Sequence, residues 1–126
     1  MSATLEHANI TVSDPKASAA ILCDLFGWTV RWEGAAIDNG YSVHVGGEGS
    51  YLALYRPGSG STKAAPRHSP EGGLNHVGIV VDDLDAMEVR VRAAGFETHS
   101  HADYEPGRRF YFDGPDGVEF ELVQYD

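Results

Sequence analysis

One short pattern occurs twice in this chain. Residues 5–12 read LEHANITV and residues 74–81 read LNHVGIVV, and both fit the frame Leu, any residue, His, two residues of any kind, Ile, any residue, Val. His7 and His76 take the same place in the two copies. A repeated strand pattern predicts two copies of one structural unit, each carrying a histidine at the same point.

The similarity continues downstream of each strand. Residues 13–15, Ser-Asp-Pro, have the form of a helix start, because Ser or Asp caps the first turn and Pro fits the first helical position. Residues 82 and 83, both Asp, take the same place in the second copy. Each predicted helix ends at a glycine suited to a left-handed cap, Gly27 in the first copy and Gly95 in the second.

Three strand-like segments follow each of these glycines. They read GWTVRW, YSVHV and YLALY in the first copy, and GFETHS, RRFYF and VEFEL in the second. Each copy therefore reads strand, helix and three strands. We expect an α+β fold of two βαβββ modules, over about 4–55 and 74–125, within one domain spanning residues 1–126.

Residues 56–73 separate the two modules and read RPGSGSTKAAPRHSPEGG. Pro, Gly and Ser dominate this stretch, and it has no apolar periodicity, so a linker is predicted. It is longer than an ordinary connection. Two roles remain open for it: covering a site, or carrying the chain between modules of different subunits.

Composition limits the classes of partner. Nineteen acidic against nine basic side chains give the 126-residue chain a formal charge of −10, which repels phosphate backbones and anionic lipid. We expect a small-molecule partner, with no nucleic acid and no membrane. The opening residues contain no apolar run of signal-peptide length, and the single Cys23 allows no intramolecular disulfide, so a cytoplasmic protein is expected.

Strand alternation predicts which side chains meet. His76 lies on the opposite face of its strand from Val77, which suits packing against the helix predicted over 84–94. In the segment VEFEL the same alternation turns Glu121 to the side of His76. An imidazole and a carboxylate are therefore expected to converge on the open face of a curved sheet. In the first module His7 matches His76, and Ala53 matches Glu121.

The paired His-headed strands, the helix after each, and the ending FDGPDGVEFELV resemble the vicinal oxygen chelate superfamily. This superfamily holds glyoxalase I, extradiol dioxygenases, fosfomycin-resistance proteins and bleomycin-binding proteins. The resemblance implies that the modules form a cupped mixed sheet with the helices on its outer face. It also implies a homodimer in which modules of two subunits share a site.

Glyoxalase-like members carry a metal ligand on the first and last strand of each module. The resemblance therefore implies His7, His76 and Glu121 as metal ligands, and it leaves Ala53 where a fourth ligand would stand. Two imidazoles and one carboxylate with open positions suit a divalent ion such as Fe, Mn, Zn or Ni. The alanine makes a glyoxalase I assignment less favourable, because the family places proton abstraction on metal-site glutamates.

We expect a metal-dependent enzyme acting on a small molecule that presents two neighbouring oxygens to the metal. Glu121, together with Tyr111 or His44, would be the catalytic residues, the latter two moving protons. Dioxygenase-type chemistry and glyoxalase-like lyase or isomerase chemistry both stay open. The alternative is a non-catalytic protein that binds an antibiotic or metabolite in an aromatic-lined cup without metal, as bleomycin-binding relatives do.

Other polar residues have weaker assignments. The spacing of the repeat matches His44 with Phe112. Residues 99–109 are expected to form a loop whose histidines and arginines, His99, His101, Arg108 and Arg109, are solvated or close over a substrate. Glu119 is expected to be solvated or hydrogen-bonded.

Overall fold

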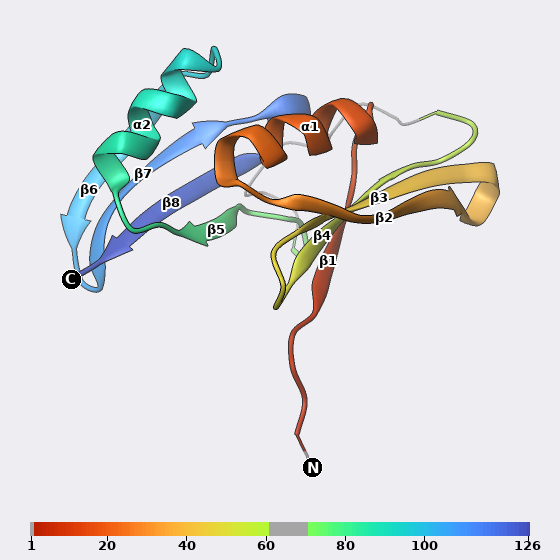
Figure 1. Ribbon diagram of the computed structural model, residues 1–126, viewed down its shortest axis with the longest axis horizontal. Coiled ribbons are helices and arrows are strands. Elements are labelled where there is room, and N and C mark those ends of the chain that lie inside the picture. Colours follow the sequence, from red (N-terminus) through yellow and green to blue (C-terminus); the bar gives the residue numbers. More distant parts are fainter. Residues whose placement is uncertain (1, 61–70) are drawn as a thin grey trace. The chain divides into compact units, whose positions relative to one another are not determined.

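The computed structural model describes residues 2–60 and 71–126 (Figure 1). The chain divides into two compact units, Met1–Lys63 and Ala64–Asp126. Each unit contains one α-helix and a four-stranded mixed sheet, in the order strand, helix and three strands. The predicted α+β fold of two βαβββ modules is therefore confirmed. Residues 61–70 of the predicted linker lie outside the described residues.

The two units have the same topology. The first contains β1 (His7–Thr11), α1 (Pro15–Phe26), β2 (Thr29–Ala36), the 3-10 turn η1 (Ile37–Asn39), β3 (Gly40–Gly46) and β4 (Tyr51–Arg56). The second contains β5 (Val77–Val80), α2 (Leu84–Ala93), β6 (Thr98–Tyr104), β7 (Gly107–Asp113), the 3-10 turn η2 (Pro115–Gly117) and β8 (Glu119–Tyr125). The strand orders are β1-β4-β3-β2 and β5-β8-β7-β6. In each sheet the first strand runs parallel to its neighbour, and the other pairs are antiparallel.

The helices begin where the sequence predicts. The Asp14 side chain accepts a hydrogen bond of 3.0 Å from the backbone N–H of Ala17, and Pro15 is the first helical residue. Asp83 caps α2 in the same way, by accepting a 3.0 Å bond from Ala86. Gly27 ends α1 in the left-handed conformation, with φ of 68°. These caps satisfy backbone groups that the helix itself leaves unpaired.

Each sheet buries one face against its own helix (Figure 1). The first unit has its buried side chains on alternate strand positions and on α1: Ile10, Leu22, Leu25, Val43, Val45, Leu52 and Leu54. The second unit does the same with Leu84, Val91, Phe110, Phe112, Phe120 and Leu122. Because side chains alternate along a strand, the residues between these positions lie on the opposite, open face. That face carries the predicted site residues.

The strand register corrects one predicted match. His44 lies opposite Ala53 in the ladder, and Tyr111 lies opposite Glu121. His44 therefore corresponds to Tyr111, whereas Phe112 is fully buried against the helix. The connection between the last two strands is one residue longer in the second unit, and this insertion shifts the spacing. His44 and Tyr111, the two residues predicted to move protons, thus occupy equivalent positions in the two units.

The predicted loop over residues 99–109 is wrong. It contains most of β6 and the start of β7, joined by a tight turn. A bulge between His99 and Ala102 interrupts the ladder, and Ser100 there has a left-handed φ of 58°. This irregularity hides the alternation by which a strand is recognised in a sequence. Within residues 2–60 and 71–126, no helix is long and apolar enough to cross a membrane.

The two helix caps give a first test of the repeat. Asp14→Ala and Asp83→Ala should each lower the free energy of unfolding by about 1 kcal/mol, because each removes the acceptor for a first-turn N–H. Urea denaturation measures the change. As a matched control, Glu48→Ala removes an equal charge from the exposed β3–β4 turn and should change stability by less than about 0.5 kcal/mol. Cap variants as stable as this control would contradict the assignment.

Candidate active site

The open face of the first unit carries a row of stacked rings. The His7 ring lies 4.9 Å from that of Tyr51, Tyr51 lies 4.7 Å from His44, and His44 lies 5.0 Å from Trp32. Trp32 is half exposed. The guanidinium of Arg31 lies 4.5 Å from the centre of the Tyr51 ring. This face can therefore stack a planar group and hold a negative charge beside it.

The orientation of His7 is set by its chain neighbour. Its Nδ1 lies 2.8 Å from Glu6 Oε1. A carboxylate oxygen only accepts hydrogen bonds, so Nδ1 carries the proton and Nε2 is the atom left for a ligand. The hydrogen bond from His7 lowers the pKa of Glu6. Burial, with the nearby charges of His7 and Arg31, lowers the pKa of His44, so that His44 is neutral at pH 7.

In the second unit Glu121 is the centre of the site. Arg109 Nη1 and the Tyr111 hydroxyl donate hydrogen bonds of 3.0 and 2.7 Å to Oε2 of Glu121. The other carboxylate oxygen, Oε1, lies 3.6 Å from Nε2 of His76. The structure thus brings together three of the predicted site residues, namely His76, Tyr111 and Glu121.

His76 repeats the arrangement of His7. Its Nδ1 lies 2.7 Å from Asn75 Oδ1, so its Nε2 faces the Glu121 carboxylate. In the neutral imidazole Nε2 is then an acceptor, and so is the carboxylate oxygen opposite it. Two acceptors that face each other need a proton or a cation between them. In both units the residue before the histidine, Glu6 or Asn75, provides the oxygen that lies beside the histidine Nδ1. The repeat between the two units therefore includes this contact.

Arg109 differs from its prediction as a surface or lid residue. It lies on β7, and only 10% of its side chain is exposed. Besides Glu121, its guanidinium contacts the ring of Tyr104, 4.4 Å away, and the carbonyl oxygen of Gly107 at 3.1 Å. Arg109 and Tyr111 both belong to the strand-like segment RRFYF, and the alternation of β7 places them on the same face.

Tyr111 is held in its protonated form. The hydrogen bond to Glu121, together with burial and the charge of that carboxylate, raises the pKa of Tyr111 to about 12. The phenol is therefore a hydrogen-bond donor across the physiological range.

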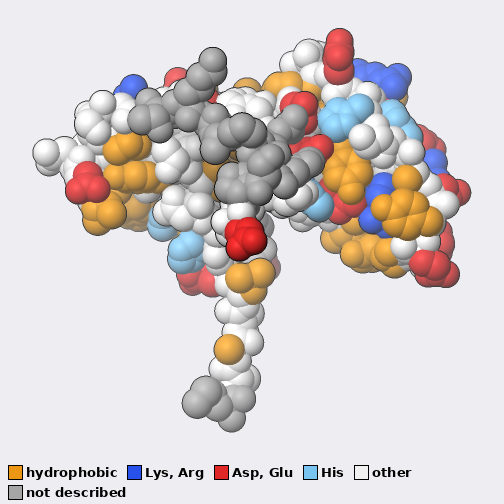
Figure 2. Space-filling model, turned by 180° about the vertical axis from the view of Figure 1, so that it is seen from behind, with side chains coloured by type: hydrophobic (Ala, Val, Ile, Leu, Met, Phe, Trp, Pro, Cys, Tyr) orange, Lys and Arg blue, Asp and Glu red, His pale blue; other side chains and the backbone are white. Residues whose placement is uncertain are grey.

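A further group on this open face was missed from the sequence. One ligand atom each from His99, Asp113 and Glu119 lies within 4.8 Å of the others. Glu119 is buried, with 7% of its surface exposed, so of the two expectations for it the solvated one is wrong. Figure 2 shows histidine, acidic and basic side chains next to one another on the second unit.

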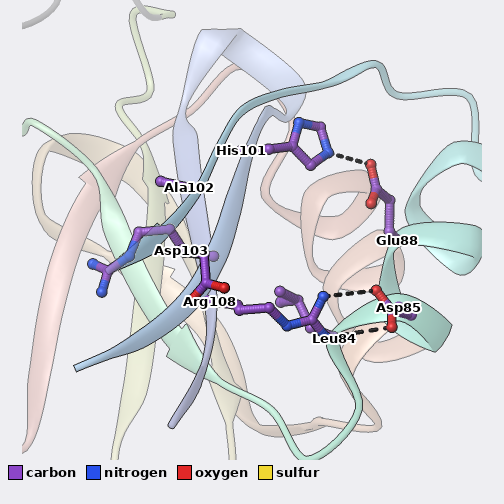
Figure 3. A pocket seen from close by; sticks show the side chains of 8 residues that line it. Leu84, Asp85, Glu88, His101, Ala102, Asp103 and Arg108 are labelled. Atoms are coloured by element: carbon purple, nitrogen blue, oxygen red, sulfur yellow. Dashed lines mark hydrogen bonds and ion pairs between the residues drawn. The ribbon is translucent and has the colours of Figure 1, made fainter. Parts of the chain in front are cut away.

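A cleft of about 320 Å³ lies on the other side of this sheet, between α2 and β6–β7 (Figure 3). Four of the side chains that line it form two ion pairs. His101 Nε2 lies 2.6 Å from Glu88, and Arg108 contacts both carboxylate oxygens of Asp85, at 3.2 and 3.3 Å. His101 and Arg108 thus lie on the helix side, away from the face of His76 and Glu121.

Comparison with known proteins identifies the family of this chain. The family model described as "Glyoxalase/Bleomycin resistance protein/Dioxygenase superfamily" matches residues 4–122. The chain belongs to this superfamily. The match covers both units, which agrees with the repeat read from the sequence.

Several solved structures resemble this chain over nearly its whole length. A glyoxylase/bleomycin resistance protein/dioxygenase domain from Frankia sp. EAN1pec has a TM-score of 0.84 at 21% identity, covering 100% of both chains. TnmS3, an antibiotic binding protein from Streptomyces sp. CB03234, has a TM-score of 0.76 at 17% identity, covering 98% of this chain and 97% of its own. The fosfomycin resistance protein FosX from Listeria monocytogenes, as a mutant with Mn(II) and 1S,2S-dihydroxypropylphosphonic acid, has a TM-score of 0.76 at 20% identity, covering 98% and 93%. These similarities show the fold.

The pKa of Tyr111 can be tested by titration. The ultraviolet difference between wild type and Tyr111→Phe should report a phenol that ionises near pH 12, against an ordinary value of 10.0. Because the pKa is raised in the folded state, the stabilisation that Tyr111 provides is complete below pH 10 and declines between pH 10 and 12. The wild type should therefore lose its stability advantage over Tyr111→Phe in that interval. Ionisation at the ordinary pKa would contradict the hydrogen bond to Glu121.

Proposed function

We propose that the protein is a divalent-metal-dependent enzyme whose small-molecule substrate binds the metal through two neighbouring oxygens. His76 and Glu121 would hold the ion, with His7 as the third ligand that the superfamily pattern assigns. The observation that carries the proposal is the pair of facing acceptors, His76 Nε2 and Glu121 Oε1, 3.6 Å apart. A cation removes the repulsion between them.

The donor set fits a metal of the Fe, Mn, Zn or Ni type, because it combines imidazole nitrogen with carboxylate oxygen. Metal-binding histidines usually donate their second N–H to a nearby oxygen, as His7 does to Glu6 and His76 to Asn75. Ligand carboxylates are likewise hydrogen-bonded, and Arg109 fills this role for Glu121. When bound, such an ion polarises substrate oxygens and stabilises developing negative charge.

Three protein groups have separate roles in this proposal. Tyr111 donates its single O–H to Oε2 of Glu121 and so holds the ligand carboxylate in place, and its pKa of about 12 keeps the phenol protonated. His44, which is neutral at pH 7, accepts a proton at the equivalent position of the first unit. Ala53 lies next to His44 in the ladder and contributes only a methyl group, so it leaves room for the substrate.

The environment of Glu121 favours one type of reaction over the other. Two donors already bind its Oε2, which suits a carboxylate that holds a fixed position. Glyoxalase-like isomerisation needs a carboxylate that carries a proton between substrate atoms. We therefore favour dioxygenase-type chemistry over proton abstraction by Glu121. The FosX structure contains Mn(II), which supports a divalent-metal site in this fold.

A non-catalytic binding protein is the second candidate. The neighbouring rings of Trp32, His44 and Tyr51 would hold a planar antibiotic or metabolite without metal. The similarity to the antibiotic binding protein TnmS3 supports this candidate. In either case we propose a cytoplasmic homodimer, because the superfamily pattern distributes the site over modules of two subunits.

Metal analysis separates the two candidates. Wild type and His76→Ala are purified from the same medium, and Fe, Mn, Zn and Ni are measured by mass spectrometry. We expect His76→Ala to contain about one ion less per chain, because it loses the ligand atom opposite Glu121. His101→Ala is the matched control, since His101 pairs with Glu88 on the helix side.

Equal metal content in His76→Ala and wild type would contradict the proposed metal site. Ligand binding that a chelator leaves unchanged, with no turnover, would favour the binding protein. Turnover abolished by the chelator and restored by one of these ions would exclude it.

A further inference from the structure

Three ligand residues lie at one end of the second sheet, where β7 turns into β8. Asp113 ends β7, Glu119 begins β8, and the two are directly opposite in the ladder. His99 reaches them from β6, and ligand atoms of all three lie within 4.8 Å of one another. This group, which we call the His99 cluster, contains none of the residues assigned to the proposed metal site. It belongs entirely to the second unit.

The charges of this cluster favour a cation. Like charges directly opposite on neighbouring strands are destabilising. Asp113 and Glu119 are such a pair, and Glu119 is buried, with 7% of its surface exposed. A divalent cation bound between the two carboxylates would offset their mutual repulsion.

His99 is oriented toward the two carboxylates. Its Nδ1 lies 2.8 Å from Ser100 Oγ, and its Nε2 lies 3.3 Å from Asp113 Oδ1. The contact with Ser100 holds the ring on one side, and Nε2 on the other side faces the Asp113 carboxylate. The ring also stacks against Tyr111, with centroids 6.2 Å apart. With 38% of its side chain exposed, His99 is accessible to an ion from solvent.

The first unit shows that the fold does not require these charges. Trp32 pairs with His44 as His99 pairs with Tyr111. The pair Gly46–Tyr51 likewise corresponds to Asp113–Glu119. The equivalent positions of the first unit thus hold an indole, a glycine and a phenol. Both units form the same sheet, so the sheet itself does not require the imidazole and two carboxylates of the second unit.

We propose that His99, Asp113 and Glu119 bind a second divalent cation, separate from the ion at His76 and Glu121. One imidazole and two carboxylates favour a first-row transition ion such as Mn²⁺ or Zn²⁺. Ca²⁺ and Mg²⁺ are less suitable, since they prefer oxygen ligands alone. The site is complete within one unit and does not depend on the proposed function.

Titration with Mn²⁺ tests this proposal on the full-length protein. The metal-free protein is titrated with MnCl₂, and free Mn²⁺ is counted by electron paramagnetic resonance. We expect wild type and the control His101→Ala to bind two ions, and His99→Ala to bind one. Glu119→Gln should lower the affinity for the same ion by about 100-fold, because the loss of a ligand costs more than the loss of a group that supports a ligand. The His99 ring is partly exposed, so His99→Ala is expected to fold normally. It therefore still tests the site if the buried substitution Glu119→Gln prevents folding.

Two further variants separate this inference from the proposed function. His76→Ala should still bind the ion of the His99 cluster, and the double variant His76→Ala/His99→Ala should bind none. If wild type binds one ion, and His76→Ala still binds it but His99→Ala does not, the metal site at His76 and Glu121 is refuted and the His99 cluster is supported. If His99→Ala and Glu119→Gln bind Mn²⁺ as wild type does, the second site is refuted.

Discussion

The carboxylate of Glu121 determines the chemistry of the second unit, because it joins three strands through one side chain. From β8 it accepts hydrogen bonds from Arg109 and Tyr111 on β7, and it faces His76 at the start of β5. Only 12% of the side chain is exposed, so the carboxylate depends on these partners in place of water. The raised pKa of Tyr111 and the buried position of Arg109 both follow from this one group.

The duplicated fold separates what packing requires from what function adds. Both units bury the same alternating positions and cap their helices with an aspartate. Their open faces differ: the first presents stacked rings around His44 and Tyr51, and the second presents carboxylates and cations around Glu121. Ala53 and Glu121 occupy equivalent ladder positions, so the first unit lacks the carboxylate that we propose as a metal ligand in the second. One face is therefore suited to stacking and the other to ions.

The repeat allowed most of the fold to be predicted from the sequence. Paired histidines, helix caps and strand alternation sufficed to bring His76 and Glu121 to one face. Tyr111 was predicted as a site residue, but Arg109, the other donor to Glu121, was missed because it was assigned to a loop over 99–109. This stretch forms strands around a bulge at Ser100. The match of His44 with Phe112 failed because the β7–β8 turn holds an extra residue, and insertions in turns leave no trace in strand patterns. Long-range register is fixed by packing that a local pattern does not contain.

Anomalous diffraction from a crystal grown with Mn²⁺ tests the central claim most directly, namely that the open face of the second unit binds divalent ions. Data collected on both sides of the manganese absorption edge locate each ion independently of the protein coordinates. The account predicts one peak beside His76 Nε2 and Glu121 Oε1, and a second among His99, Asp113 and Glu119. Fully occupied Mn²⁺ elsewhere, with neither position showing a peak, would contradict it.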